Sequence, residues 1–157
     1  MSDPFIENLV DRPDLVTTIA ALQFAHWGAL TGHDTELDYE NFLKKAARST
    51  RLPSVLVARR GPIYMGSVNL LASEMTIRPE LSPWMAQLFV VESARGHGIG
   101  IRLIRALTTR AVELGFRRVH LFTSGTLPTY YAALGWKPIE EVEYLGRMRT
   151  VMAIELP

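Results

Sequence analysis

The feature that most constrains the fold of this chain is a buried strand that leads through a glycine-rich turn into a helix. Residues 84–91 are almost wholly apolar, which is typical of a strand covered on both faces of a sheet. Three alternating glycines follow the strand: Gly96, Gly98 and Gly100. Residues 99–114 then carry apolar side chains at helical spacing, and Gly115 ends that pattern. The sequence therefore predicts a central strand, a tight turn and a crossover helix.

The turn between this strand and this helix is a candidate phosphate site. Glycines lack a Cβ atom, so backbone N–H groups can converge on a ligand, and the helix N-terminus adds unpaired donors and a positive partial charge. The segment is not a P-loop, because no Gly-Lys-Ser/Thr follows, and its glycine spacing differs from the dinucleotide fingerprint of Rossmann folds. The simpler alternative is a strand-to-helix turn without a ligand.

The remaining segments indicate an α/β chain with a mixed arrangement of helices and strands. Two helical patterns, over residues 15–30 and 35–48, precede most of the strands. The strands at 84–91 and 117–123, joined by a helix, imply parallel neighbours connected by a right-handed crossover. Shorter elements complete the pattern: an apolar segment at 5–10, a hairpin over 54–59 and 63–71, a short helix at 128–134, and a terminal hairpin over 139–144 and 148–156. We expect residues 1–157 to form one domain of the mixed α+β class.

Composition excludes several classes of function. The 157 residues include no cysteine, which rules out disulfides, thiolate metal sites and a thioester formed on a cysteine. The four histidines are scattered, so we expect no metal site. A net charge of +1 gives no strong field toward nucleic acid or anionic lipid. The N-terminus carries an acid where a secretory signal carries bases, and no run approaches the ~18 apolar residues of a membrane span. We therefore expect a cytoplasmic protein with no nucleic-acid or membrane partner.

Two segments carry a resemblance to a known family. The hexapeptide at 95–100, Arg-Gly-His-Gly-Ile-Gly, resembles the Arg/Gln-x-x-Gly-x-Gly/Ala signature of the GNAT superfamily of N-acetyltransferases. The segment at 131–136, Tyr-Ala-Ala-Leu-Gly-Trp, resembles the Tyr-x-x-x-Gly-Phe segment of the same family. Two motifs in the family's order are more specific than either alone. The resemblance implies a GNAT-like single domain, with a central mixed sheet of six to seven strands flanked by about four helices. It also implies acetyl transfer from acetyl-CoA to a primary amine.

The same resemblance implies which residues contact coenzyme A. Backbone amides of the turn would bind the pyrophosphate, Arg95 would brace the loop, and the end of the preceding strand would pair with the pantetheine arm. His97 is expected to contribute its backbone only. Ser124 stands where many family members carry an asparagine that helps to hold coenzyme A. The expected contacts are Leu88, Phe89, Val90, Val91, Arg95, Gly96, His97, Gly98, Ile99, Gly100, Ser124 and Tyr131.

Transfer from a thioester to an amine needs an oxyanion donor, a general acid and a general base. Tyr131 matches the family tyrosine whose hydroxyl approaches the sulfur of coenzyme A, so the resemblance implies that it is the acid. Tyr130 is the rival for that role, and an aromatic packing role for Tyr131 is the alternative. A backbone N–H near Phe89 or Val90 would polarise the carbonyl by the same resemblance.

The general base is less constrained by the sequence. Gln87 stands in the strand where some relatives place a glutamate, and an amide is not a useful proton acceptor. Glu74, shortly after the strand at 63–71, is therefore the first candidate for the base. His26 is the second candidate and His120 the third, and a water chain is equally admissible.

Sequence leaves the acceptor open among a protein N-terminus, a lysine, a polyamine, an aminoglycoside and a small metabolite. The partner is thus a small-molecule or peptide amine, and a homodimer is left open as well. Two other functions are alternatives to catalysis. One is a non-catalytic acyl-CoA-binding sensor or regulatory module with the same fold, and the other is a nucleotide-binding protein unrelated to coenzyme A.

Overall fold

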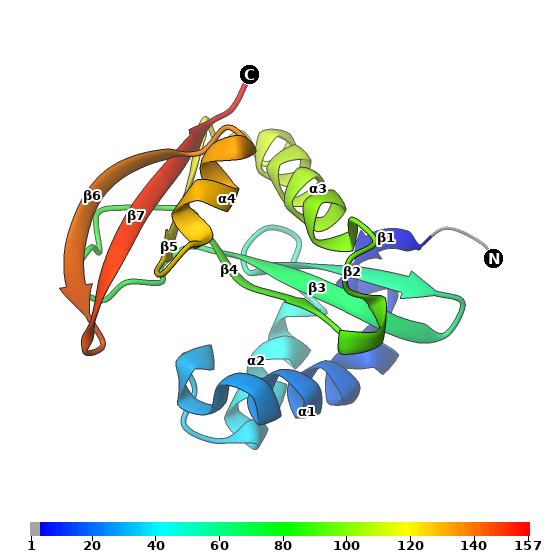
Figure 1. Ribbon diagram of the computed structural model, residues 1–157. Helices are drawn as coiled ribbons and strands as arrows, with labels where there is room; N and C mark the ends of the chain where they lie inside the picture. The colour runs from blue at the N-terminus through cyan, green and yellow to red at the C-terminus, as the bar shows by residue number, and fades with distance from the viewer. Residues whose placement is uncertain (1–3) are drawn as a thin grey trace.

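One mixed sheet separates two layers of helices in this protein (Figure 1). The structure is a computed structural model that describes residues 4–157, so the N-terminal acid at Asp3 lies outside the described residues. Over the described range the sheet contains seven strands: β1 (Phe5–Asn8), β2 (Ser54–Arg60), β3 (Ile63–Leu71), β4 (Trp84–Val90), β5 (Arg118–Thr123), β6 (Lys137–Tyr144) and β7 (Arg147–Glu155). Helices α1 and α2 cover one face, and α3 and α4 cover the other (Figure 1).

The helices occur where helical periodicity predicts them. Within the described residues there are four α-helices: α1 (Val16–Trp27), α2 (Glu36–Ala46), α3 (Ile99–Glu113) and α4 (Leu127–Ala133). Short 3₁₀ turns accompany them: η1 (Leu9–Asp11), η2 (Pro13–Leu15), η3 (Gly28–Thr31) and η4 (Glu92–Ala94). Gly28 ends α1 because its φ of 56° is left-handed, a conformation that glycine adopts without strain. The expected mixed α+β class, with six to seven strands and about four helices, is confirmed.

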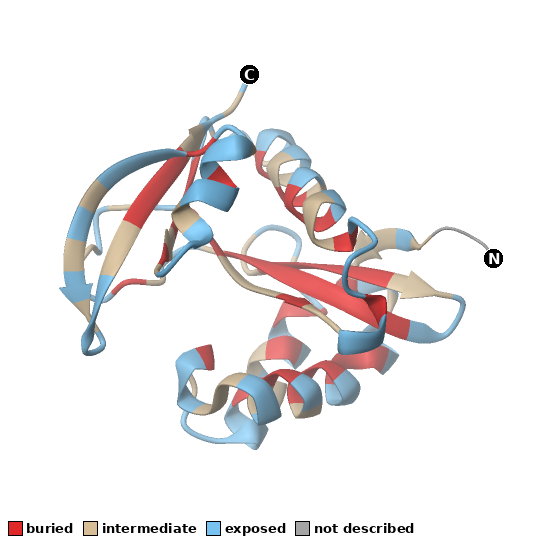
Figure 2. Ribbon diagram, in the orientation of Figure 1, coloured by how far each residue is buried: buried red, intermediate tan, exposed pale blue. Residues whose placement is uncertain are grey.

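Two cores fill the space between the sheet and its helix layers. Helix α3 buries Leu103 and Leu107 against one face, and α1 and α2 bury Ile19 and Leu43 against the other. Figure 2 shows the buried stripe of α3 and the buried central strands meeting in the first of these layers. The period of the apolar residues in α3 therefore fixes which side of the helix faces the sheet. No helix in the described part of the chain is long and apolar enough to cross a membrane.

Strands β4 and β5 open the sheet at its centre. The strand order is β1-β2-β3-β4-β5-β7-β6, and β4 and β5 are the parallel neighbours. Among the described residues they pair at one position, Trp84 with His120, beside a hydrogen bond of 2.9 Å from the His120 N–H to the Pro83 oxygen. Beyond this point the strands separate, as Figure 1 shows. The edge of β4 that faces β5 is therefore left without a strand partner toward its C-terminal end.

A bulge bends β4 where it leaves β5. Ser67 of β3 pairs with Phe89, but Asn69 pairs with Ala86, so β4 carries one extra residue between these pairs. Gln87 lies in this bulge with a φ of 48°, a left-handed conformation that is rare outside glycine. Such strain persists where surrounding contacts fix it, and it is frequent near functional sites.

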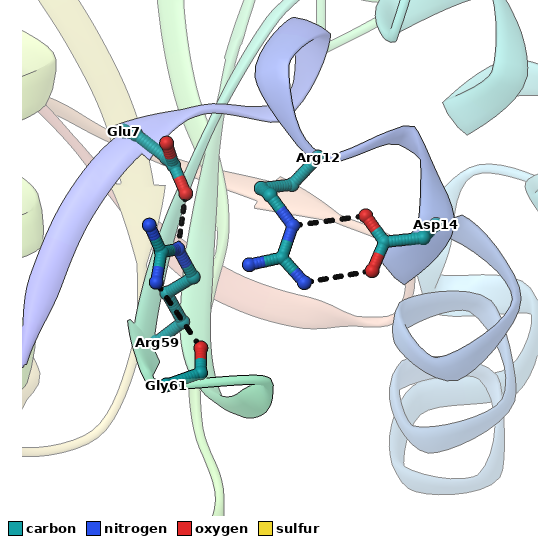
Figure 3. A network of polar contacts seen from close by, with 5 residues as sticks. All are labelled: Glu7, Arg12, Asp14, Arg59 and Gly61. Carbon is teal, nitrogen blue, oxygen red and sulfur yellow. Dashed lines mark hydrogen bonds and ion pairs between the residues drawn. The ribbon is translucent and has the colours of Figure 1, made fainter.

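Salt bridges fasten the outer strand β1 and the turn that follows it (Figure 3). Arg59 of β2 pairs with Glu7 of β1, and it also donates a hydrogen bond of 3.2 Å to the Gly61 oxygen. Arg12 donates two hydrogen bonds to Asp14, at 2.9 and 2.7 Å. The Arg12–Asp14 pair is exposed and adds little free energy, whereas the Arg59–Glu7 pair is partly buried and links β1 to β2 at the edge of the sheet.

Candidate active site

The glycine turn between β4 and α3 has the geometry of an anion site. Gly96 and Gly98 adopt left-handed φ values of 81° and 78°, and a Cβ atom added at either would face open space. The N–H groups of the first turn of α3 follow directly, and helix N-termini leave such donors unpaired. Arg95 donates a hydrogen bond of 2.9 Å from Nε to the Val90 oxygen. This bond links the turn to the end of β4.

A pocket of about 380 Å³ lies at this turn and along the free edge of β4. Its lining contains seven of the residues expected to contact coenzyme A: Leu88, Val90, Arg95, Gly96, Gly98, Ile99 and Gly100. Ala94, Ile101 and Tyr130 complete the wall. A free strand edge, an open glycine backbone and a helix N-terminus lie together at this pocket, and this combination is suited to binding an anion.

Five other expected contacts lie outside this lining. Phe89 faces the opposite side of the sheet, with ring centroids 5.5 Å from His26 and 5.7 Å from Trp27. The Val91 N–H donates to the Met65 oxygen at 2.9 Å. His97 is exposed, and its Nδ1 lies 3.3 Å from the Ala94 oxygen.

The other two, Ser124 and Tyr131, lie on the far side of the opening in the sheet. Ser124 directly follows β5 and is partly exposed, and its carbonyl oxygen accepts a bond of 3.4 Å from the Leu127 N–H at the start of α4.

Two adjacent tyrosines of α4 point in different directions. Tyr130 is 38% exposed and lines the pocket at the turn, where a Cβ atom added at Gly100 would lie 3.9 Å from the Tyr130 hydroxyl. Tyr131 is 8% exposed and packs edge-on against Trp136, with ring centroids 6.2 Å apart. Burial, with a smaller contribution from Tyr130, raises the pKa of Tyr131 to about 12. The Tyr131 phenol therefore stays protonated throughout the neutral pH range.

Glu74 lies in the loop after β3, between two further pockets on the α1 side of the sheet. One pocket, of about 310 Å³, includes His33, Phe42 and Ser73 in its wall. The other, of about 140 Å³, is lined by Trp27, Leu30, Glu74, Met85, Ala86, Gln87 and Phe122. Glu74 and Gln87 belong to both walls, so they stand at the junction of the two pockets.

The surroundings of Glu74 suit a proton acceptor at neutral pH. Burial raises the pKa of Glu74 to about 7, although a hydrogen bond with the Gln87 side chain opposes this shift. An ordinary glutamate has a pKa near 4.3, so the protein holds this carboxyl close to the working pH of a general base. Gln87 of the β4 bulge thus contacts the Glu74 side chain.

The two histidines considered as bases are placed differently. His120 is 3% exposed in β5, its Nδ1 lies 3.1 Å from the Pro83 oxygen, and its Nε2 has no partner among the described residues. Burial is the main cause that lowers the pKa of His120. His26 is exposed on α1 and contacts Trp27 edge-on, with ring centroids 5.1 Å apart. Neither histidine lines the pockets around Glu74.

No group of three or more metal-ligating side chains occurs among residues 4–157.

Comparison with known proteins assigns the fold and the family. The sequence model of the Acetyltransferase (GNAT) family matches residues 19–135, which is well over half of the chain. The chain therefore belongs to the GNAT acetyltransferase family, and it is an acyl-CoA-dependent N-acetyltransferase with acetyl-CoA as co-substrate. No curated protein sequence matches the chain.

Solved structures of similar fold cover nearly the whole chain. An acetyltransferase of the GNAT family from Streptococcus pneumoniae is 17% identical, with a TM-score of 0.72 and coverage of 99% of this chain and 100% of that one. The protein yncA from Salmonella typhimurium, solved with its cofactor acetyl-CoA, is 18% identical, with a TM-score of 0.72 and coverage of 99% and 95%. An aminoglycoside 6'-N-acetyltransferase complexed with coenzyme A is 15% identical, with a TM-score of 0.75 and coverage of 96% of each chain.

Proposed function

We propose that the protein acetylates the primary amine of a small acceptor, with Glu74 as general base and Tyr131 as general acid. The observation that carries this proposal is the placement of Glu74. Its carboxyl lies at the junction of two pockets beside the β4 bulge, and its pKa is raised to about 7. The glycine turn and the free edge of β4 supply the site for acetyl-CoA on the other side of the sheet.

Each residue has a distinct part in the proposed reaction. The amine nitrogen attacks the thioester carbonyl carbon, forming the N–C bond while the C–S bond breaks. Glu74 accepts the proton that the nitrogen loses, and a carboxyl with a pKa near neutrality is suited to that transfer. A backbone N–H of β4 near Phe89 or Val90 polarises the carbonyl oxygen. Tyr131 donates its phenolic hydrogen to the departing thiolate.

The walls around Glu74 favour an acceptor with one amine and an apolar body. Among the described residues that line the two pockets, Glu74 is the one acid, and burial lowers the pKa of His33 against the opposing effect of Asp38 and Asp34. Trp27 and Phe122 supply aromatic surface. Inside these two pockets, each further ammonium of a polyamine or aminoglycoside would lose water without meeting a second acid in the lining, which is costly.

An amine panel tests the reaction and the acceptor class together. With acetyl-CoA, we expect 2-phenylethylamine to be acetylated with a kcat/KM at least about tenfold above that of spermidine or kanamycin, since about 1.4 kcal/mol of binding corresponds to that ratio. Product formation should be followed by mass spectrometry and corrected for acetyl-CoA hydrolysis. A preference for the polycations would contradict the proposed acceptor. Binding of acetyl-CoA without turnover on any amine would instead support the sensor reading.

Blocking the glycine turn should weaken coenzyme A. In Gly100→Glu the new side chain would start 3.9 Å from Val90 and from the Tyr130 hydroxyl, and would bring a negative charge into the pocket. We expect the Kd for coenzyme A, measured by calorimetry, to rise at least about tenfold. His97→Ala is the matched control, because His97 is exposed and only its backbone is assigned to the ligand. Unchanged affinity in folded Gly100→Glu would exclude the turn as the pyrophosphate site.

A further inference from the structure

A chain of buried hydrogen bonds leads from α1 through β3 to Glu74. Its members are polar side chains that the apolar layer between the sheet, α1 and α2 would otherwise exclude: Gln23, Tyr39, Tyr64, Ser67, Asn69 and Gln87. Gln23, Tyr39, Ser67 and Asn69 have no exposed surface. Buried polar groups of this kind are retained at a cost in desolvation, so a defined role for their donors and acceptors is expected.

In the first part of this hydrogen-bond network, the partners of Gln23 fix which way its amide oxygen and nitrogen point. Tyr39 donates its hydroxyl hydrogen to Gln23 Oε1. Gln23 Nε2 in turn donates to Ser67 Oγ at 2.8 Å and to the Tyr64 hydroxyl at 3.2 Å. Because the Tyr39 hydroxyl donates its hydrogen to Gln23, its oxygen can accept a hydrogen bond from the next residue of the network.

Asn69 and Gln87 continue that direction toward the cleft. Asn69 Nδ2 donates to the Tyr39 hydroxyl at 3.3 Å and to Gln87 Oε1 at 2.9 Å. An amide nitrogen has two hydrogens, so both donors of Asn69 are used, while its Oδ1 has no partner in the described part of the chain. Because the oxygen of Gln87 faces Asn69, its Nε2 faces the other way, toward the Thr31 oxygen at 3.4 Å and the Glu74 carboxyl.

We propose that Asn69 and Gln87 are positioning residues, which hold an N–H donor against the Glu74 carboxyl and so keep it oriented and ionisable as the base. The inference rests on the proposed role of Glu74. The β4 bulge supports it independently, since Gln87 reaches this place with a left-handed φ of 48° that its neighbours must enforce. A glutamate at position 87 would present an acceptor to Glu74, whereas the observed amide presents a donor.

The other titratable groups around Glu74 are few among the described residues. His33, from the segment between η3 and α2, shares the larger pocket, and burial lowers the pKa of its ring although the nearby Asp38 and Asp34 oppose this shift. Tyr39, from α2, interacts electrostatically with Glu74, and burial raises the pKa of the Tyr39 phenol far above neutrality. Gln87 is therefore the neighbour whose orientation decides whether Glu74 meets a donor or an acceptor.

Two substitutions reverse or remove that donor. Gln87→Met keeps the length of the side chain but has no N–H, so burial would act on Glu74 unopposed. In Asn69→Asp, the ionised carboxylate can only accept hydrogen bonds. Gln87 would therefore turn its Nε2 toward position 69 and its oxygen toward Glu74. Tyr64→Phe is the control, because it removes a buried hydroxyl of the same chain at the end remote from Gln87.

The test is a direct titration of Glu74 by ¹³C NMR of its carboxyl, assigned by its loss in Glu74→Gln, together with the pH profile of kcat/KM. We expect Gln87→Met and Asn69→Asp each to raise the Glu74 midpoint by about one pH unit, with Tyr64→Phe leaving it in place. The acid limb of kcat/KM should move by the same amount. An unshifted midpoint in both folded variants would overturn the positioning role. A midpoint that shifts while the rate profile stays fixed would keep the positioning role and refute Glu74 as the base.

Discussion

Replacing Tyr131 with phenylalanine should lower kcat by ~10²- to 10⁴-fold, because the variant keeps the ring and loses the hydrogen that the thiolate requires. The ring packs beside Trp136 and is 8% exposed, so its removal would disturb the core, whereas loss of the hydroxyl alone should not. The Kd for coenzyme A should change little. Steady-state kinetics with the best amine, together with calorimetry for coenzyme A, separate the two effects.

The neighbouring tyrosine provides the matched control for this prediction. Tyr130 lines the coenzyme pocket and is 38% exposed, so Tyr130→Phe should weaken coenzyme A modestly and leave kcat nearly intact. Because burial raises the pKa of Tyr131 to about 12, its ionisation produces no basic limb in the rate profile near neutral pH. If Tyr130→Phe loses kcat and Tyr131→Phe does not, the acid has been assigned to the wrong member of the pair.

The part of the fold around β4 follows from the sequence because several local signals agree there. The apolar run of β4, the glycines after it and the helical period of α3 each demand one conformation, and the two motifs lie in the order of the family. Helix α4 is different, because seven residues give too short a pattern to show which of Tyr130 and Tyr131 points to the core. The structure decides that question through packing against Trp136.

The environment of Glu74 could not be predicted from local sequence. The residue itself was a candidate because the strand lacks a glutamate, but its raised pKa depends on a loop that folds back onto β4 and on the α1 side of the sheet. The β4 bulge was equally hidden, since Gln87 is not a residue type that signals a left-handed backbone. The Gln87 amide is a poor proton acceptor, but it donates a hydrogen bond to the Glu74 carboxyl.

Long-range geometry also explains which expected coenzyme contacts lie apart from the pocket. Alternation along a strand sends neighbouring side chains to opposite faces, so Leu88 and Val90 line the pocket while Phe89 packs toward α1. Its backbone can still take part in the site. Tyr130 belongs to the wall because its hydroxyl reaches toward Gly100 in the first turn of α3, a contact that no local pattern indicates.

Replacing Glu74 with glutamine should lower kcat/KM by ~10²- to 10⁴-fold and abolish the acid limb of the rate profile near pH 7. Below that pH the carboxyl of the parent protein is protonated and cannot accept the proton of the amine, so activity rises with pH until Glu74 is ionised. Glutamine has nearly the same size but no titration, and the residual activity should therefore lose this dependence. Affinity for coenzyme A should be unchanged, since Glu74 lies outside the pocket at the turn.

The same substitution should stabilise the protein at high pH, which tests the buried carboxyl without reference to activity. A carboxyl whose pKa is raised from near 4.3 in the unfolded chain to about 7 in the folded protein contributes stability that is fully present below the unfolded pKa and is lost as the pH rises through about 7. Urea denaturation should show Glu74→Gln more stable than the parent by about 1 to 3 kcal/mol at pH 8.5, and nearly equal to it at about pH 4. Glu140→Gln is the control, because pairing with Arg78 lowers the pKa of Glu140 instead of raising it. Loss of the Glu140 carboxylate should therefore make the protein less stable at pH 8.5. Stability of Glu74→Gln that does not depend on pH, together with an unchanged rate profile, would show that Glu74 is an ordinary surface acid and would remove it from the mechanism.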